Sequence, residues 1–244
     1  MDENLRDKTI YRSFGITQNE LKMIAVVSMI IDHIGEELFP HLTILRIMGR
    51  LAFPIFSYCI FEGCRHTHNK RRYLLQILLL GILCVIGYYI FSGEIYGNIL
   101  ITFSLSICVL YAFCYFKQRI SGSVADKCIG CALFLFTMAA AYALCTCMYI
   151  DYGFCGVMLP VLAELSCELA GKKSEKYRFA PIVGFSIGLV VLSFQMGVPQ
   201  WFSLFSLPLL LAYNGSRGER NMKSFFYWFY PAHLMAIGLI SIIM

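Results

Sequence analysis

Residues 73–92 of the chain read YLLQILLLGILCVIGYYIFS, an apolar run without a charged side chain. A helix needs about 20 such residues to cross the hydrocarbon core of a bilayer. Eight further apolar runs lie at residues 21–39, 43–63, 98–116, 127–150, 154–170, 179–197, 200–213 and 224–243. The runs at 154–170 and 200–213 are short, so either can be tilted or re-entrant. The pattern predicts an all-α fold, a polytopic transmembrane helix bundle of about nine membrane segments.

The composition indicates a membrane protein without a separate soluble domain. Of the 244 residues, 59% are hydrophobic and 14% are charged, whereas a soluble domain carries about 25% charged and 45–50% apolar residues. We therefore predict a polar cytoplasmic arm at residues 1–20 and a single transmembrane bundle domain at residues 21–244. No small-residue cleavage site follows the first apolar run, which indicates a retained helix and not a signal peptide.

Lysine and arginine residues are concentrated in alternate loops. Loops rich in these cations stay on the cytoplasmic side of a membrane, so we predict a cytoplasmic N-terminus and an outer C-terminus. This topology accounts for the net charge of +5 and makes membrane lipid, and not nucleic acid, the expected partner. The loop cations are Arg6, Lys8, Arg12, Lys22, Arg65, Lys70, Arg71, Arg72, Lys117, Arg119, Lys127, Lys172, Lys173, Lys176, Arg178, Arg217, Arg220 and Lys223.

Two arginines break this pattern, because Arg46 and Arg50 fall at the outer end of the span at 43–63. They are one helical turn apart and therefore share a face. Two guanidinium groups on one face suit a carboxylate pair, a phosphate or an oxyanion. The alternative is that the side chains reach out to the lipid headgroups, which suits Arg46 better than the deeper Arg50. Pro54 follows and is expected to bend the helix.

The first span carries four ionisable residues near its middle and outer end: Asp32, His33, Glu36 and Glu37. Glu36 and Glu37 follow His33 by three and four residues, so either carboxylate can lie beside the ring. A carboxylate that accepts a ring N–H fixes the tautomer and makes the other nitrogen more basic. We predict that Asp32 pairs with an arginine of the second span. This pair either only locks two helices together or belongs to a catalytic or proton-handling site around His33.

A dense cationic loop follows the second span. It contains Arg65, His66, Lys70, Arg71 and Arg72. The loop either serves topology and lipid-phosphate contact or binds an anionic cytoplasmic ligand such as a nucleotide or a coenzyme A phosphate. No metal is expected, because the histidines of this loop lack a third ligand. The CxxC spacing of Cys128 and Cys131 likewise has no second pair.

The last span contains Tyr230 and His233 in a run of aromatic residues. The two are three residues apart and share a face, near the middle of the bilayer. The aromatic run indicates packing or an interfacial belt, and His233 is either structural or part of the polar site.

Several motifs together resemble the TraX family of bacterial membrane proteins over nearly the whole chain. The matching stretches are 21–24, 31–35, 46–56, 62–63, 66–69, 73–74, 98–103, 151–153 with Gly156, 213–215 with Gly218, and 226–234. The resemblance implies acyl transfer. For the founding member of the family, the implied reaction is acetylation of the N-terminus of a conjugative pilin subunit. It also implies location in the bacterial cell (cytoplasmic) membrane.

We therefore expect an integral membrane acyltransferase that moves an acetyl group from cytoplasmic acetyl-CoA to an amine or hydroxyl acceptor. A pilin-like peptide N-terminus is one such acceptor. In this hypothesis His33 is the general base, oriented by Glu36 or Glu37, or else a nucleophile that forms an acyl-enzyme. Arg50, with His233 or Tyr230, stabilises the oxyanion, and Asp32 holds Arg46 or Arg50. The residues expected to bind acetyl-CoA are Arg65, His66, Lys70, Arg71, Arg72 and Asn214.

Two other classes of function use the same residues. Intramembrane Asp, His, Arg and Glu also build the proton relays of proton-coupled transporters. Transporters often contain repeated halves, and no repeat is visible in this sequence. A non-catalytic membrane assembly protein is the third class, and it requires neither His33 nor Arg50 for its function.

Overall fold

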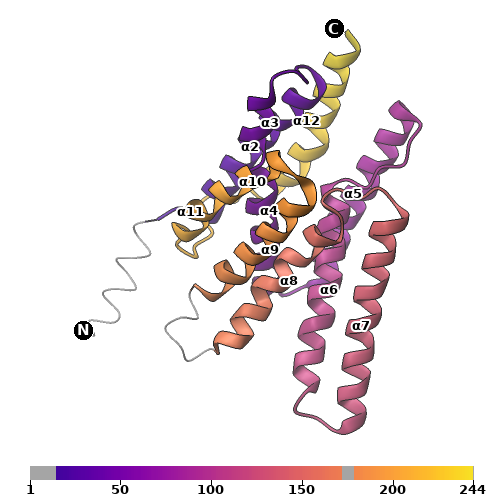
Figure 1. The fold of residues 1–244 in the computed structure, drawn as a ribbon, viewed down its shortest axis with the longest axis vertical. Helices are drawn as coiled ribbons and strands as arrows, with labels where there is room; N and C mark the ends of the chain where they lie inside the picture. Colours follow the sequence, from indigo (N-terminus) through magenta and orange to yellow (C-terminus); the bar gives the residue numbers. More distant parts are fainter. Residues whose placement is uncertain (1–14, 172–178, 244) are drawn as a thin grey trace. The chain divides into compact units, whose positions relative to one another are not determined.

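The structure is a computed structural model that describes residues 15–171 and 179–243 (Figure 1). These residues form helices joined by short turns, and no strand occurs among them. The elements are α2 (Gln18–Glu37), α3 (Thr43–Gly49), α4 (Ala52–His66), α5 (Lys70–Ser92), α6 (Ile99–Arg119), α7 (Val124–Cys147), α8 (Gly153–Ala170), α9 (Ala180–Met196), α10 (Val198–Trp201), η2 (Phe202–Phe205), α11 (Ser206–Leu211) and α12 (Lys223–Ile243). The predicted all-α class is confirmed.

Each predicted apolar run is helical in the structure, with ends that differ by a few residues. The run at 200–213 is interrupted, because α10, the 3₁₀ helix η2 and α11 follow one another there. Five helical stretches among the described residues are long and apolar enough to cross a membrane. They are 43–66, 70–92, 99–119, 124–147 and 153–170. Crossing by the remaining runs and a cytoplasmic N-terminus stay predictions.

The chain divides into two compact units, one of residues 1–59 and 193–244 and the other of residues 60–192. The first unit contains α2, α3, α10, η2, α11 and α12. Part of the predicted arm, with Arg6, Lys8 and Arg12, lies outside the described residues, as do Lys172, Lys173, Lys176 and Arg178. The prediction of one bundle domain at 21–244 stays a prediction.

In the second unit, α6 is the central helix and packs against α5, α7 and α8. Ile107 and Val109 of α6 are fully buried. The neighbouring α5 and α7 expose most of their apolar side chains. A helix that is apolar all round and exposed in the isolated chain is typical of a lipid-facing span.

The start of α2 is fixed by local and by distant contacts. Thr17 and Glu20 form a capping box, in which each side chain bonds the backbone of the other residue. Hydrogen bonds from the backbone N–H and the hydroxyl of Thr17 lower the pKa of the Glu20 carboxyl. The backbone N–H groups of Gln18 and Asn19 donate to the carbonyls of Ser216 and Arg217, just before α12. These bonds join the start of α2 to the segment that leads into α12, and the two helices pack together.

Helices α2 and α3 form a closely packed antiparallel hairpin. Ser28 of α2 donates a hydrogen bond to the carbonyls of Met48 (2.7 Å) and Gly49 (3.0 Å) at the end of α3. Gly35 lies opposite Leu45 near the turn, where an added Cβ would come within 2.6 Å of the leucine Cβ. Small residues on α2 and α3 therefore allow their backbones to approach closely.

The predicted bend near Pro54 is present as a break between α3 and α4, at Arg50 and Leu51. Proline has no N–H to donate to the carbonyl four residues earlier, and its ring crowds that carbonyl. In this chain that carbonyl belongs to Arg50. The break sets the end of α3, so the two arginines lie on the last turn of a short helix.

Candidate functional site

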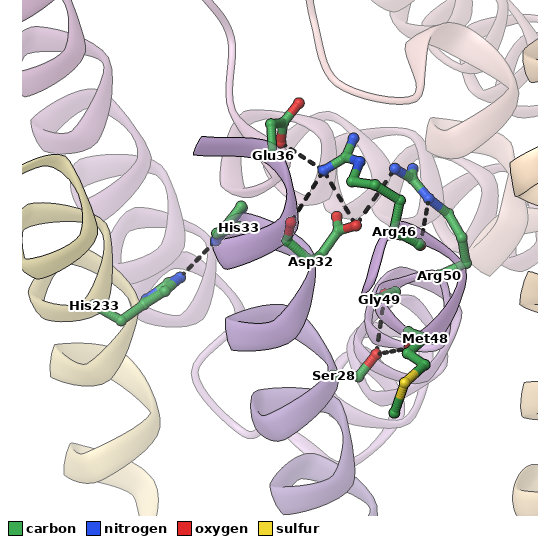
Figure 2. Close-up of polar contacts among 9 residues, drawn as sticks. All are labelled: Ser28, Asp32, His33, Glu36, Arg46, Met48, Gly49, Arg50 and His233. Carbon is green, nitrogen blue, oxygen red and sulfur yellow. Dashed lines mark hydrogen bonds and ion pairs between the residues drawn. The ribbon is translucent and has the colours of Figure 1, made fainter. Parts of the chain in front are cut away.

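The candidate site is built around two consecutive residues of α2 that face different neighbours. Figure 2 shows Asp32 directed toward α3 and its arginines, and His33 directed toward His233 of α12. Consecutive residues of a helix lie about 100° apart around its axis. The carboxylate of Asp32 therefore points toward one neighbouring helix, and the imidazole of His33 points toward the other.

On the α3 side, two arginines and two carboxylates form an ion cluster. Arg46 Nη1 lies 3.1 Å from Asp32 Oδ1 and 2.7 Å from Glu36 Oε2. Arg50 Nη2 lies 3.5 Å from the same Asp32 oxygen. The predicted pairing of Asp32 with an arginine of the second span is confirmed, and both arginines take part (Figure 2).

The two arginines differ in exposure. The side chain of Arg50 is 9% exposed, against 25% for Arg46. A guanidinium group has five N–H donors. Within the described residues, Arg50 uses two of them, Nε to the Arg46 carbonyl at 3.3 Å and Nη2 to Asp32. Arg50 therefore retains donors for a further oxygen atom in a largely buried setting.

On the α12 side, His33 Nδ1 and His233 Nε2 are 2.9 Å apart, and the rings are stacked with centroids 5.0 Å apart. His233 Nδ1 lies 3.0 Å from the carbonyl of Phe229. A carbonyl oxygen only accepts, so Nδ1 of His233 carries a hydrogen and its Nε2, in the neutral ring, accepts. His33 Nδ1 must then donate, which leaves the lone pair of neutral His33 on Nε2.

Aromatic side chains of α12 surround His233. Phe229 stacks on the imidazole with a centroid distance of 5.1 Å. Tyr230, which is buried, contacts it edge-on at 5.5 Å. The predicted shared face of Tyr230 and His233 is confirmed, and the two rings limit the orientations that the His233 imidazole can take.

The predicted orientation of His33 by Glu36 or Glu37 needs correction. The carboxylate of Glu36 binds Arg46, and the ring nitrogen of His33 contacts His233. Glu37 is exposed at the end of α2. A carboxylate beside a guanidinium gains a charge-assisted hydrogen bond, which is stronger than a bond to neutral imidazole. The orienting group is therefore His233.

Ser28 and Gly49 support the ion cluster and were not predicted. Ser28 precedes Asp32 by four residues, and Gly49 directly precedes Arg50. A Cβ atom at Gly49 would collide with the carboxyl group of Asp32. The sequence does contain a signal for this contact. Gly49 is a small residue between the two arginines of the second span, and small residues in such a span indicate close approach of another helix.

Comparisons with known proteins agree with the motifs. The family model described as TraX protein matches residues 17–241.

The chain belongs to the TraX family.

Two relatives of this TraX-family chain differ in how much of their length they share with it. One is an uncharacterized protein of Rickettsia prowazekii (strain Madrid E), 34% identical over 150 residues, or 61% of this chain and 55% of that protein. The chain thus matches little more than half of the Rickettsia protein. The other is the probable fimbrial assembly protein FimC, serogroup H1, of Dichelobacter nodosus, 25% identical over 250 residues, which covers 91% of this chain and 95% of that protein. No solved structure matches the chain significantly.

The predicted acetyl-CoA-binding cations of this TraX-family chain lie at the end of α4 and the start of α5, in the second unit. Helix α4 ends with Arg65 and His66. The first turn of α5 directly follows its N-cap, Asn69, and consists of Lys70, Arg71 and Arg72. Arg65 lies over the ring of Phe61, and Lys70 lies over the ring of Tyr111. Three cations at a helix N-terminus repel the positive end of the helix dipole, so this turn is well suited to bind an anion.

Asn214 belongs to the first unit and not to this loop. Its side-chain oxygen accepts from the backbone N–H (2.9 Å) and hydroxyl (2.7 Å) of Ser216, and its amide nitrogen donates to the carbonyl of Gly15 at 3.2 Å. These contacts support the segment that holds the start of α2. Across the described ranges, no group of three or more His, Cys, Asp and Glu residues is arranged to hold a metal ion.

Gly49→Ala is expected to destabilise the hairpin of α2 and α3, because the new methyl group displaces Asp32 from the ion cluster. Overpacking of this kind costs about 1–3 kcal/mol. The thermal unfolding midpoint of the purified protein in detergent measures the effect. Gly87→Ala is the matched control, because an added Cβ there meets nothing within 4 Å. Equal midpoints for the two variants would contradict the close approach at Gly49.

Proposed function

We propose that this TraX-family membrane protein is an acyltransferase that moves an acetyl group from acetyl-CoA to an amine or hydroxyl acceptor. The observation that carries the proposal is the chain of contacts from the Phe229 carbonyl through His233 to His33. It leaves a lone pair on His33 Nε2 and holds the ring in one tautomer. A positioned imidazole in this state is suited to general-base catalysis.

In the proposed reaction, the acceptor nitrogen or oxygen attacks the thioester carbonyl carbon while its proton passes to His33 Nε2. A carbon–nitrogen or carbon–oxygen bond forms, and the carbonyl oxygen becomes an oxyanion. When the intermediate collapses, the carbon–sulfur bond breaks, and the thiolate of coenzyme A takes the proton from His33. The acceptor leaves acetylated, and the ring returns to its starting tautomer.

The ion cluster supports the second requirement of this chemistry, stabilisation of the oxyanion. Arg50 is buried and, within the part of the chain that the structure describes, retains N–H donors beyond those that bond Asp32 and the Arg46 carbonyl. One pre-positioned donor to an oxyanion contributes about 3–4 kcal/mol. Asp32 holds the guanidinium in place, and Glu36 neutralises Arg46. In this proposal Arg50 acts on the substrate, whereas Arg46 supports Asp32.

The donor carries phosphate groups, which require cations. Lys70, Arg71 and Arg72 in the first turn of α5, with Arg65 and His66 at the end of α4, offer these charges. We assign the coenzyme A phosphates to this loop, because phosphates bind well at helix N-termini that also carry cations. The predicted cytoplasmic side of this loop suits a donor that comes from the cytoplasm.

For the acceptor, we infer the N-terminal amine of a pilus or fimbrial subunit. The family resemblance implies a pilin, and the Dichelobacter relative is described as a probable fimbrial assembly protein. Both point to a peptide exported for assembly on the cell surface. Acetylation removes the positive charge of a terminal amine, which makes burial of that terminus less costly.

The test is transfer of labelled acetyl groups. Membranes containing the protein are incubated with acetyl-CoA labelled in the acetyl group and a synthetic peptide that begins with a pilin-subunit N-terminus. We expect label on the peptide, and none on the same peptide with its N-terminus already acetylated. The proposal fails if no label reaches peptide, lipid, glycan or protein and hydrolysis does not exceed that of membranes lacking the protein.

A second candidate function, non-catalytic assembly of surface fibres, is favoured by the description of the Dichelobacter relative. On this view the ion cluster and the histidine pair only lock α2 against α3 and α12. Fibre assembly would then survive loss of His33, provided that the protein still inserts into the membrane.

A proton-coupled transporter, in contrast, predicts proton flux in liposomes that contain the purified protein.

A further inference from the structure

The segment from α10 to α11 has a polar face buried inside the protein and an apolar face exposed. Gln200 is 1% exposed, and Ser203 and Ser206 are fully buried. The three residues are spaced by three, so they lie along one side of the helical segment. On other sides, Val198 is 75% and Phe205 66% exposed. This is the reverse of a soluble amphipathic helix, and it suits a segment with lipid outside and polar groups inside.

The polar atoms of this buried face have no hydrogen-bond partner among the described residues. They are the amide nitrogen and oxygen of the Gln200 side chain and the hydroxyls of Ser203 and Ser206. Ser186 of α9, in contrast, donates to a carbonyl of its own helix, that of Ile182, at 2.7 Å. Buried polar groups are almost always paired, and leaving several unpaired along one face is costly. These atoms therefore remain available to bond a further polar group.

The segment is held in place beside the arginine-bearing helix. The hydroxyl of Ser193, at the end of α9, donates to the backbone carbonyl of Gln200 at 3.2 Å. Helix α10 contacts α3, whose last turn carries Arg46. The buried polar face thus belongs to the same unit as the ion cluster and lies on an element that contacts it.

The chemistry of the three side chains selects a kind of ligand. All are uncharged, so they do not compensate a phosphate or carboxylate. The amide of Gln200 offers donors and an acceptor in one plane, and each hydroxyl both donates and accepts. A secondary amide, with one N–H and one C=O, is complementary to this set.

We propose that Gln200, Ser203 and Ser206 form a subsite for a neutral, amide-bearing chain of the substrate. The proposal rests on the acyltransferase function above. Two parts of the substrates share this chemistry, the pantetheine arm of acetyl-CoA and the peptide backbone of the acceptor. The subsite would hold either one while the charged and reacting groups are bound elsewhere.

Binding without turnover tests the subsite. Full-length protein in detergent is titrated by calorimetry with S-acetylpantetheine and, separately, with the acceptor peptide. We expect Gln200→Leu to weaken binding of one probe about tenfold, since an unpaired amide in the bound ligand is costly. Weaker binding of S-acetylpantetheine assigns the subsite to the donor, and weaker binding of the peptide assigns it to the acceptor. The double variant Ser203→Ala with Ser206→Ala is expected to weaken binding of the same probe. It provides a second test if Gln200→Leu does not fold.

Ser186→Ala is the matched control, because its hydroxyl is satisfied within α9, and it is expected to bind both probes as the wild type does. The subsite is overturned if neither probe binds the wild type, or if every variant binds both probes as tightly as the wild type does. The second result would mean that neither substrate contacts the polar face. Binding changes without any acetyl transfer would leave the subsite standing and remove the acyltransferase, so the two failures are distinguishable.

Discussion

His33→Ala is expected to lower the rate of acetyl transfer by about 10²–10⁴-fold, the usual contribution of a general base. The imidazole is the group whose tautomer is fixed by the contact with His233, and alanine offers no proton acceptor. The measurement is the rate of label transfer to the peptide at matched amounts of inserted protein. His41→Ala is the control, because His41 is an exposed histidine in the turn after α2.

Variants of His233 separate positioning from folding. His233→Leu removes the acceptor for His33 Nδ1–H, whereas His233→Gln retains an oxygen that can accept. We therefore expect His233→Gln to transfer acetyl groups faster than His233→Leu, at similar thermal midpoints. Full activity of purified His33→Ala would leave the proposed reaction without its base and would favour the assembly function.

Arg50→Lys is expected to lower the rate by about 10²–10³-fold, the range seen when one oxyanion donor is removed. Lysine keeps the charge that Asp32 requires but loses the planar fork of donors. Because the charge pair is retained, the amount of inserted protein should change little. The loss should appear in kcat, since the interaction is strongest with the oxyanion and not with the bound thioester.

Two control variants define what is special about Arg50. Arg46→Lys keeps a cation beside Asp32 and Glu36 in a more exposed position, and a loss of less than about tenfold is expected there, in the range of an exposed ion pair. Arg119→Lys changes a pair with Asp126 in the second unit and should have no effect on transfer. Equal rates for Arg50→Lys and the wild type would reduce the cluster to a helix lock.

The positions of the helices could be predicted from the sequence because apolar runs and caps are local signals. The run at 73–92 became α5 (Lys70–Ser92), with Asn69 as its cap and Gly93 beyond its end. Pro54 likewise predicted the bend of the second span, because a missing N–H acts on a carbonyl four residues away. The run at 200–213 differed, since it forms short helices in place of one, with Pro199 just before the run and Pro208 within it.

The partners of the site residues were predicted only in part. Spacing along α2 placed Glu36 within reach of His33, but Arg46 from the next helix forms a charged pair with that carboxylate. The residue that hydrogen-bonds the His33 ring is His233, which is 200 positions away in the chain. No pattern within one helix specifies such a contact, because it depends on which helices pack together.

The sequence by itself determined the membrane class of this chain, the ranges of its helices and the set of ionisable residues within them. These properties follow from side-chain transfer energies and backbone bonding, which act over a few residues. Only the tertiary structure decided that His33 faces His233, that Glu36 pairs with Arg46, and that Gln200 points inward. Those outcomes depend on the packing of α2 against α3 and α12 and of α10 against α3. Packing between distant helices is decided by the whole chain at once.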